Sequence, residues 1–249
     1  MRKPFDADIY FDMTAAILVG LLSGFLAGLV GIGGGFIFVP LIMTIYSNVN
    51  IHKAIATSSG FAVAAGLSSF VSHVRKASPY TDITAGFLAG SLAGAVAGPY
   101  ISLLIAENIL TKLFAAIVIL PVLIRALRFS IKPRMVYIVV LGLLIGCFSS
   151  IFGIGGGILL MPILVQAFNL DLRRSLTTSA LFIAVNSAIA TTVYACKGFV
   201  MWEILLFAAP AGIAGAFFGA RVSQKLNPAY IKAALIALML GVVVKMLLE

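Results

Sequence analysis

Charge is scarce in this sequence, and the long apolar runs carry almost none of it. Only 10% of the 249 residues are charged, 62% are hydrophobic, and the mean hydropathy is +1.16. Soluble domains have about 25% charged residues, so this composition excludes an ordinary soluble fold and indicates a membrane protein. All eight acidic residues and both histidines fall at or near the ends of the apolar runs.

Cysteine is equally rare, and this excludes further classes of protein. Cys147 and Cys196 are the two cysteines; they lie within or directly beside apolar runs and lack the spacing of a disulfide framework or a metal site. The runs contain no HExxH motif, no paired carboxylates, and no Ser/His or Cys/His pair, which are the groups that intramembrane catalysis would need. We therefore expect no enzyme, no metal and no cofactor.

What the sequence does have is a series of apolar stretches of about 17 to 25 residues, the length that crosses a bilayer as a helix. They predict an all-α polytopic membrane protein with about eight transmembrane helices. Two shorter apolar pieces, 36–46 and 158–168, are too short to cross alone and predict half-helices or re-entrant arms. The eight predicted spans are 13–30, 54–74, 83–106, 108–124, 135–152, 175–195, 200–220 and 228–248.

Basic residues give a net charge of +9, but they are scattered among short connectors and form no basic domain, which argues against binding to nucleic acid. The densest group is Arg125, Arg128, Lys132 and Arg134, in the segment 125–134 between the two halves of the chain. The positive-inside rule predicts that this connector is cytoplasmic.

The chain contains an internal duplication. GIGGGFIFVP at 31–40 recurs as GIGGGILLMP at 153–162, an offset of 122. With one residue dropped, HKAIATSSGF at 52–61 aligns with RRSLTTSALF at 173–182, which pairs Thr57 with Thr178 and Ser58 with Ser179. We therefore divide the chain into a first transmembrane repeat at 1–124, the connector at 125–134 and a second repeat at 135–249.

The relative orientation of the two repeats depends on the segments that the glycines interrupt. If each interrupted segment crosses the membrane once, the repeats are parallel. If each folds back to its starting side, every half has three net crossings and the repeats are inverted. The distribution of Lys and Arg leaves both arrangements open.

The glycine loops predict a polar site. Non-helical backbone at membrane depth survives only where it is buried in protein or lines a cavity. Helices beginning just after Gly35 and Gly157 would place Pro40 and Pro162 in the first turn, where proline is tolerated. Each loop would then present free N–H groups and the positive end of a helix dipole to an anion. For the glycines spaced by four, Gly90, Gly94, Gly98, Gly215 and Gly219, we expect tight helix packing instead.

Hydroxyl and amide side chains complete the predicted site. Ser and Thr after each loop can donate to an oxyanion without bringing charge into the membrane, although they also bond carbonyls one turn back. Asn186 is expected to face the protein interior, either as a contact between helices or at the site. The predicted substrate-binding residues are Gly33, Gly34, Gly35, Thr57, Ser58, Gly155, Gly156, Gly157, Thr178, Ser179 and Asn186.

Taken together, these motifs resemble the TauE/SafE family of sulfite and organosulfonate permeases. The duplicated GxGGG(x)4P motif, the TS-rich segment after it, the late GxxxG stretch running into Gly219, Ala220 and Arg221, and the length carry the resemblance over nearly the whole chain. It implies a multi-pass transporter of the bacterial or archaeal inner (plasma) membrane that moves small sulfur oxyanions or sulfonates.

The function that these observations favour is a membrane permease for a small anion, with the substrate and the lipid bilayer as its partners. The substrate site of a duplicated transporter lies near the midplane, between the repeats, and is built from broken helices. A passive anion channel and a membrane assembly subunit are the alternatives. Association into a homo-oligomer is left open.

Overall fold

The computed structural model describes residues 13–30, 34–46, 48–126 and 132–223, and within these ranges the chain forms helices and short loops without a strand. The prediction of an all-α fold is confirmed. Three parts of the predictions lie outside the described residues: Gly33 of the predicted site, positions 127–131 of the basic connector, and the predicted span 228–248.

Nine α-helices and one π-helical turn occur in the described part of the chain. Five of the helices, α3, α4, α6, α8 and α9, contain segments long and apolar enough to cross a membrane, as a polytopic membrane protein requires. The predicted spans 13–30 and 108–124 form α1 and α5. In order, the elements are α1 Met13–Val30, α2 Gly35–Ile45, α3 Ile51–Val74, α4 Thr81–Leu104, α5 Glu107–Ala126, α6 Met135–Phe152, α7 Gly157–Pro162, the π turn η1 Ile163–Ala167, α8 Leu172–Cys196 and α9 Trp202–Ser223.

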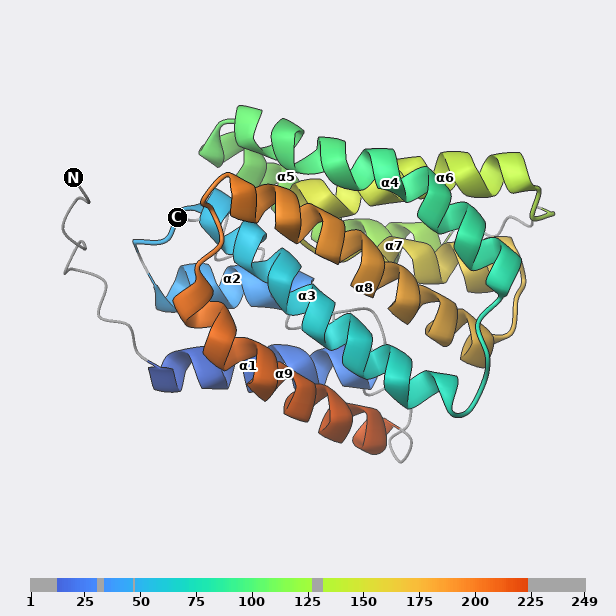
Figure 1. Ribbon diagram of the computed structural model, residues 1–249, viewed down its shortest axis with the longest axis horizontal. Coiled ribbons are helices and arrows are strands. Elements are labelled where there is room, and N and C mark those ends of the chain that lie inside the picture. The colour runs from blue at the N-terminus through green and yellow to red at the C-terminus, as the bar shows by residue number, and fades with distance from the viewer. Residues whose placement is uncertain (1–12, 31–33, 47, 127–131, 224–249) are drawn as a thin grey trace.

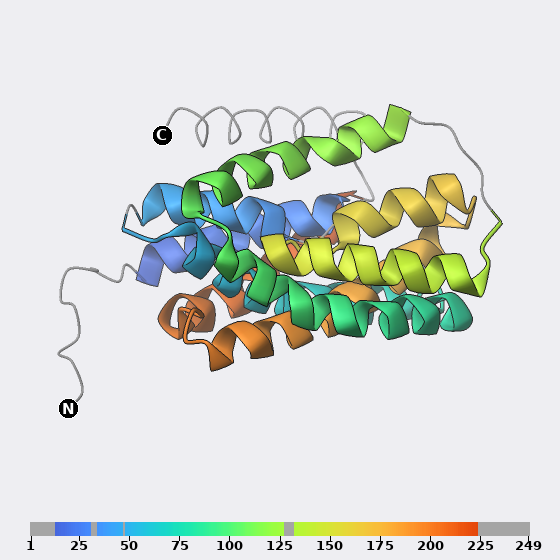
Figure 2. The same cartoon turned by 90° about the horizontal axis from the view of Figure 1, so that it is seen from above.

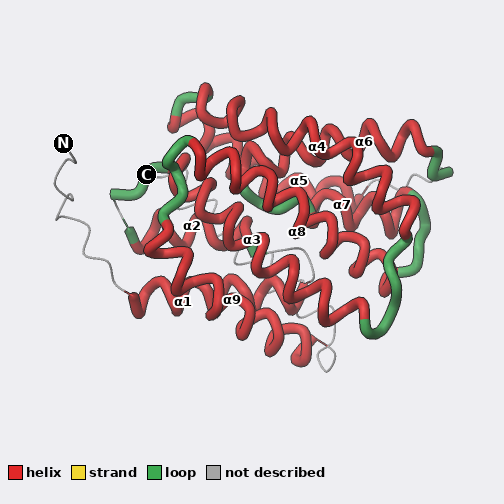
Figure 3. The backbone as a smooth tube through the Cα atoms, viewed as in Figure 1, coloured by secondary structure: helices red, strands yellow, loops and turns green. Residues whose placement is uncertain are grey.

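Helices α3 and α8 lie side by side in the middle of the molecule and run in opposite directions (Figures 1 and 3). The hydroxyl of Thr177, near the start of α8, donates to the carbonyl oxygen of Ala77, just past the end of α3, over 2.9 Å. Further along, Gly66 of α3 packs against Ala184 of α8. The pair α1–α9 flanks this centre on one side and the pair α4–α6 on the other.

Glycines bring the flanking helices into backbone contact. A side chain at these glycines would press into the backbone of the partner helix, so the helices approach as closely as helices can. In each pair the residue numbers of the contacting positions increase together along both helices, which means that the two helices are parallel. The packing role expected of Gly90, Gly94, Gly98 and Gly215 is thereby confirmed. The contacts are Gly20–Ala208, Gly24–Gly212, Gly28–Ala216 and Gly215–Leu21 in α1–α9, and Gly90–Val139, Gly94–Leu143 and Gly98–Cys147 in α4–α6.

The two short apolar pieces form helical arms that begin where they were expected, at Gly35 and Gly157. In Figure 1 each arm turns back and ends at the side of the molecule where the helix before it began. The placement of the prolines was wrong: Pro40 and Pro162 are the sixth residues of their helices, past the first turn. Because Pro162 has no N–H to continue the α-helical ladder, α7 gives way to the π turn η1 at the next residue.

Matching caps begin the two central helices. The side chain of Asn50 accepts a hydrogen bond of 3.0 Å from the N–H of Lys53, and that of Asp171 accepts one of 3.0 Å from the N–H of Arg174. A cap of this kind stabilises a helix by about 1 kcal/mol. The two caps are 121 positions apart, the offset that also aligns Thr57 with Thr178.

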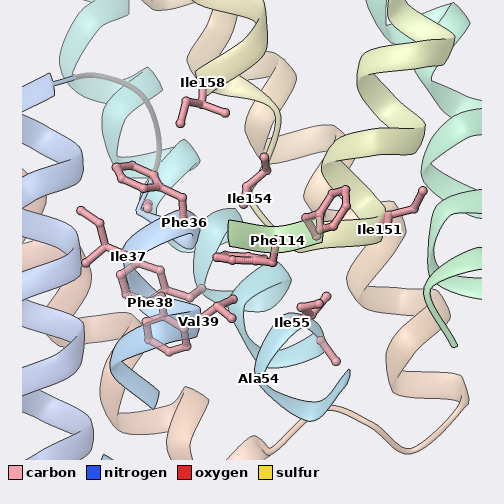
Figure 4. Packing of buried hydrophobic residues seen from close by; sticks show 14 of the residues in the cluster. Phe36, Ile37, Phe38, Val39, Ala54, Ile55, Phe114, Ile151, Ile154 and Ile158 are labelled. Atoms are coloured by element: carbon pink, nitrogen blue, oxygen red, sulfur yellow. The ribbon is translucent and has the colours of Figure 1, made fainter. Parts of the chain in front are cut away.

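An apolar core surrounds the short arms and holds the glycine loops in place. Phe38 of α2 stacks on Phe61 of α3, with ring centres 4.3 Å apart. Ile154 and Ile158, from the second glycine loop and the start of α7, belong to the same buried cluster (Figure 4). Seen from above, α5 covers the face of the molecule beside the two arms (Figure 2).

Candidate functional site

The two glycine loops meet at one side chain, Ser58 of α3. Its hydroxyl oxygen lies 3.0 Å from the carbonyl oxygen of Gly35 and 2.8 Å from that of Gly153, so its single proton is shared between one acceptor from each half of the chain. Ser58 is fully buried. The structure therefore brings both predicted loops together at Ser58, which is 23 residues from Gly35 and 95 residues from Gly153 in sequence.

Backbone contact at this joint is direct. A Cβ atom built on Gly35 would overlap the carbonyl oxygen of Gly153 and lie 2.9 Å from the Ser58 hydroxyl. Gly153, Gly155 and Gly156 have φ angles of 64°, 75° and 82°, the left-handed region that glycine adopts without steric cost. Gly34, the counterpart of Gly156, has φ −86°, so the two copies of the motif differ in backbone conformation.

Each arm begins with backbone N–H groups that make no hydrogen bond within the arm. The first N–H groups bonded within the arms are those of Ile37, to the carbonyl of Gly34, and Leu159, to the carbonyl of Gly156. The N–H groups of the residues just before them precede the hydrogen-bond ladder, as at any helix N-terminus. They are the donors of Gly35, Phe36, Gly157 and Ile158.

A buried polar cluster surrounds the second loop. The amide nitrogen of Asn186 donates to the hydroxyl of Ser149 over 2.9 Å and to that of Ser150 over 3.3 Å. Ser187, next to Asn186, lies with its hydroxyl 3.3 Å from a Cβ built on Gly155. The side-chain oxygen of Asn186 and the hydroxyl of Ser187 are buried and have no hydrogen-bond partner among the described residues. Asn186 thus faces the protein interior, as expected.

Ser179, the counterpart of Ser58, is also fully buried, and its hydroxyl has no partner among the described residues. The residue of the first loop that corresponds to Gly153 is Gly31, which lies outside the described part of the chain. The role of Ser179 in binding a ligand therefore stays a prediction.

Thr57 and Thr178 make other contacts. The hydroxyl of Thr57 donates to the carbonyl of Lys53 over 2.8 Å and accepts a 3.0 Å bond from the N–H of Met201, just before α9. The hydroxyl of Thr178 accepts a 3.0 Å bond from the N–H of Tyr80, just before α4. These two threonines join the central helices to the starts of the flanking helices, and their role in binding a ligand stays a prediction.

Sequence reasoning missed three residues of the polar cluster, namely Ser149, Ser150 and Ser187. A signal was present, because the serine pair stands three residues before the GIGGG motif in SSIFGIGGG and Ser187 follows Asn186 directly. All three side chains are buried.

The chemistry available at this site is that of neutral donors. Backbone N–H groups, hydroxyls and one amide surround the loops, and the described residues contain no group of three or more His, Cys, Asp or Glu that could hold a metal ion. Such a site can bind an oxyanion through hydrogen bonds and two helix dipoles. None of the described residues named for this site has a charged side chain.

Comparison with known proteins agrees with this class of molecule. Residues 16–246 match the model of the family described as "Sulfite exporter TauE/SafE". The chain is 23% identical over 243 residues to the probable membrane transporter protein YunE of Bacillus subtilis, covering 85% of this chain and 88% of that protein. It is 28% identical over 223 residues to a probable membrane transporter protein of Xylella fastidiosa, covering 84% of each. It is 26% identical over 237 residues to the probable membrane transporter protein MJ0441 of Methanocaldococcus jannaschii, covering 87% and 88%. No solved structure matches.

Proposed function

Because the chain belongs to the TauE/SafE sulfite exporter family and is a multi-pass membrane transporter, we propose that it carries a small oxyanion of the sulfite or organosulfonate class through a site where its two glycine loops meet. The family description supports the sulfur oxyanion. The relatives' names say only that they are probable transporters, so the substrate rests on the chemistry of the site.

The observation that carries this proposal is the joint at Ser58, where one buried hydroxyl contacts the carbonyl oxygens of Gly35 and Gly153. It places the start of the first arm, α2, against Gly153, the residue that follows α6 and opens the glycine loop leading into α7. Each helix N-terminus carries about half a positive charge, so two of them approximate one cation. An anion is held in this way without the cost of burying a full ionic side chain in the membrane.

We also infer that the two repeats are inverted. Counterpart helices α3 and α8 run in opposite directions, and both short arms fold back. The helix pairs support the same arrangement, because the first helix of each half packs in parallel on the helix that follows the central helix of the other half: α1 on α9, which follows α8, and α6 on α4, which follows α3. Inverted repeats around a central site built from broken helices are common among secondary transporters.

The face that carries the connector is proposed to be cytoplasmic, in a cell inner membrane. Met135, at the start of α6, packs against Gly86 near the start of α4, so the connector lies at the same end as the loop between α3 and α4. Arg75 and Lys76 are exposed in that loop, and Arg174 reaches it through the carbonyl of Ser78. A concentration of basic residues at one end supports the positive-inside assignment.

Two experiments test this function. Purified protein is screened by thermal shift against sulfite, sulfate, thiosulfate, taurine and sulfoacetate, and a specific ligand raises the midpoint in proportion to RT ln(1 + [L]/Kd). Counterflow in proteoliposomes then separates a carrier from a passive channel, because a carrier exchanges external label for internal unlabelled anion. No shift with any of the five anions would contradict the proposed substrate class, and flux without counterflow would indicate a channel.

A further inference from the structure

A pocket whose lining combines serines with a larger apolar surface lies between the second half of α3 and the helix pair α1–α9. Three serines and a histidine of α3 line one wall, Ser68, Ser69, Ser72 and His73, and small residues of α1 line another. The enclosed part has a volume of ≈ 20 Å³, about the room that one water molecule needs. Serine hydroxyls along this face can contact water or a polar solute in the pocket.

The inner end of this pocket reaches both glycine loops. Ala27, which lines the pocket, has its Cβ atom 3.3 Å from a Cβ built on Gly34. Ile183, on the opposite wall, has its Cγ2 atom 2.9 Å from a Cβ built on Gly155. A single side-chain layer therefore separates the pocket from the site proposed above.

The outer end of the pocket is positively charged. Phe217 of α9 lines it and is 46% exposed, and the guanidinium carbon of Arg221 lies over the Phe217 ring, 4.1 Å from its centre. Arg75 and Lys76, both exposed, follow His73 at the end of α3. Positive charge around a depression raises the local concentration of anions and speeds their association.

The corresponding region of the second half is filled. Ser149, Ser150, Asn186 and Ser187 stand where the pocket has Ala27, Gly28, Ala65 and Gly66, at offsets of 122 in the first helix of the half and 121 in α8. At the counterpart of His73, Tyr194 is fully buried and donates its hydroxyl proton to the carbonyl of Ser150 over 2.9 Å. The two halves therefore differ. The first half has a pocket that opens toward the connector face, whereas buried side chains fill the counterpart region of the second half, toward the opposite face.

We propose that this pocket is the access site for the transported anion on the connector face, where Arg221 attracts the anion to the mouth and Ser68, Ser69 and Ser72 bind it on its way to the glycine loops. The proposal rests on the proposed function. Passage requires α3 and the α1–α9 pair to separate, because the enclosed volume is smaller than an oxyanion. The glycine contacts between α1 and α9 let that pair move as one unit.

The test uses one cysteine at a time in a Cys147→Ser, Cys196→Ser background that retains transport. Ser72→Cys is expected to react with a membrane-impermeant thiol reagent from the connector face, and sulfite is expected to slow the reaction at least about threefold. The matched control is Val193→Cys, at the counterpart position and also half-buried. It is expected to react slowly from either face, with no protection by sulfite.

A second variant keeps the proposal falsifiable if the cysteine disturbs the fold. Arg221→Gln is expected to lower sulfite uptake from the connector face at least about threefold at low salt and less at high salt, where charges are screened. Lys197→Gln, at the end of α8 on the opposite face, is its control.

The outcomes are distinguishable. If wild-type protein binds sulfite but Ser72→Cys is neither labelled nor protected, and Arg221→Gln takes up sulfite as the wild type does, the access site is refuted while the proposed function stands. If the wild type shows no thermal shift and no counterflow with any of the five anions, both proposals fail.

Discussion

The hydroxyl oxygen of Ser58 lies 2.8 Å from the carbonyl oxygen of Gly153, although the two residues belong to different halves of the chain. The same hydroxyl contacts Gly35, so one proton of α3 is shared between the start of α2 and the first residue of the second glycine loop. A carrier must change the relation of its two halves during transport. This joint is therefore expected to matter for stability and for exchange between states.

Replacing Ser58 with alanine should leave two buried carbonyl oxygens without their donor. An unsatisfied buried acceptor costs about 1–3 kcal/mol, so we expect a lower thermal midpoint together with slower counterflow. Ser59→Ala is the control, because the Ser59 hydroxyl bonds only within α3, to Ile55. Equal effects of the two substitutions would show that the joint has no special role.

Substituting Thr57 or Thr178 by valine separates two roles for these residues. Because their hydroxyls accept hydrogen bonds from Met201 and Tyr80, each valine should reduce stability by about 1 kcal/mol. If these hydroxyls also bind the anion, as the sequence predicts, the dissociation constant for the anion should rise as well. Thermal melts and binding titrations on the same samples measure both, and a weaker affinity in either variant would place its hydroxyl in the substrate site.

A large side chain at the contact between α4 and α6 should prevent the protein from folding. A side chain at Gly94 would overlap the carbonyl of Leu143, so Gly94→Leu is expected to give little folded protein. Ala97→Leu, on the exposed face of the same helix, adds the same volume where it meets lipid. Its yield and its monodispersity on size exclusion should match those of the wild type, and similar losses in both variants would speak against this packing.

The orientation of the chain can be tested with a cysteine already present. Cys196 is exposed at the end of α8, and that helix starts at the connector end and runs to the opposite face. In a Cys147→Ser background, Cys196 should react with an impermeant thiol reagent in intact cells, whereas a Lys132→Cys variant that also carries Cys196→Ser should react only after permeabilisation. The reverse pattern would place the connector outside.

Local signals in the sequence were enough to predict where the arms begin. Gly35 and Gly157 end apolar runs and precede short apolar segments, so the helix starts follow from backbone propensity alone. Hydropathy likewise predicted α6 at Met135–Phe152. The glycines spaced by four predicted close helix packing, although the sequence did not say which helix would be the partner.

The hydrogen-bond partners of the site residues depend on tertiary contacts, which the sequence alone does not show. The bond that Thr57 accepts from Met201 spans 144 residues, and no local pattern marks it. The cluster around Asn186 depends on α6 lying beside α8, which brings Ser149 and Ser150 within reach. Gly34 and Gly156 occupy the same place in identical GIGGG motifs and pack against counterpart phenylalanines, Phe61 and Phe182, yet their φ angles have opposite signs.

The most direct test compares the sulfite affinity of two alanine variants, Gly156→Ala and Gly198→Ala, by titration of the purified proteins. Both glycines have left-handed backbones, with φ of 82° and 76°, so both substitutions carry a similar strain of about 1–2 kcal/mol. Only Gly156 lies in a glycine loop, where the new methyl group would crowd Phe182 and Ser149, whereas a Cβ on Gly198 meets no atom within 4 Å. The proposed site predicts that Gly156→Ala binds sulfite at least about tenfold more weakly than Gly198→Ala, a difference of about 1.4 kcal/mol. Equal affinities in the two folded variants would contradict an anion site at the glycine loops.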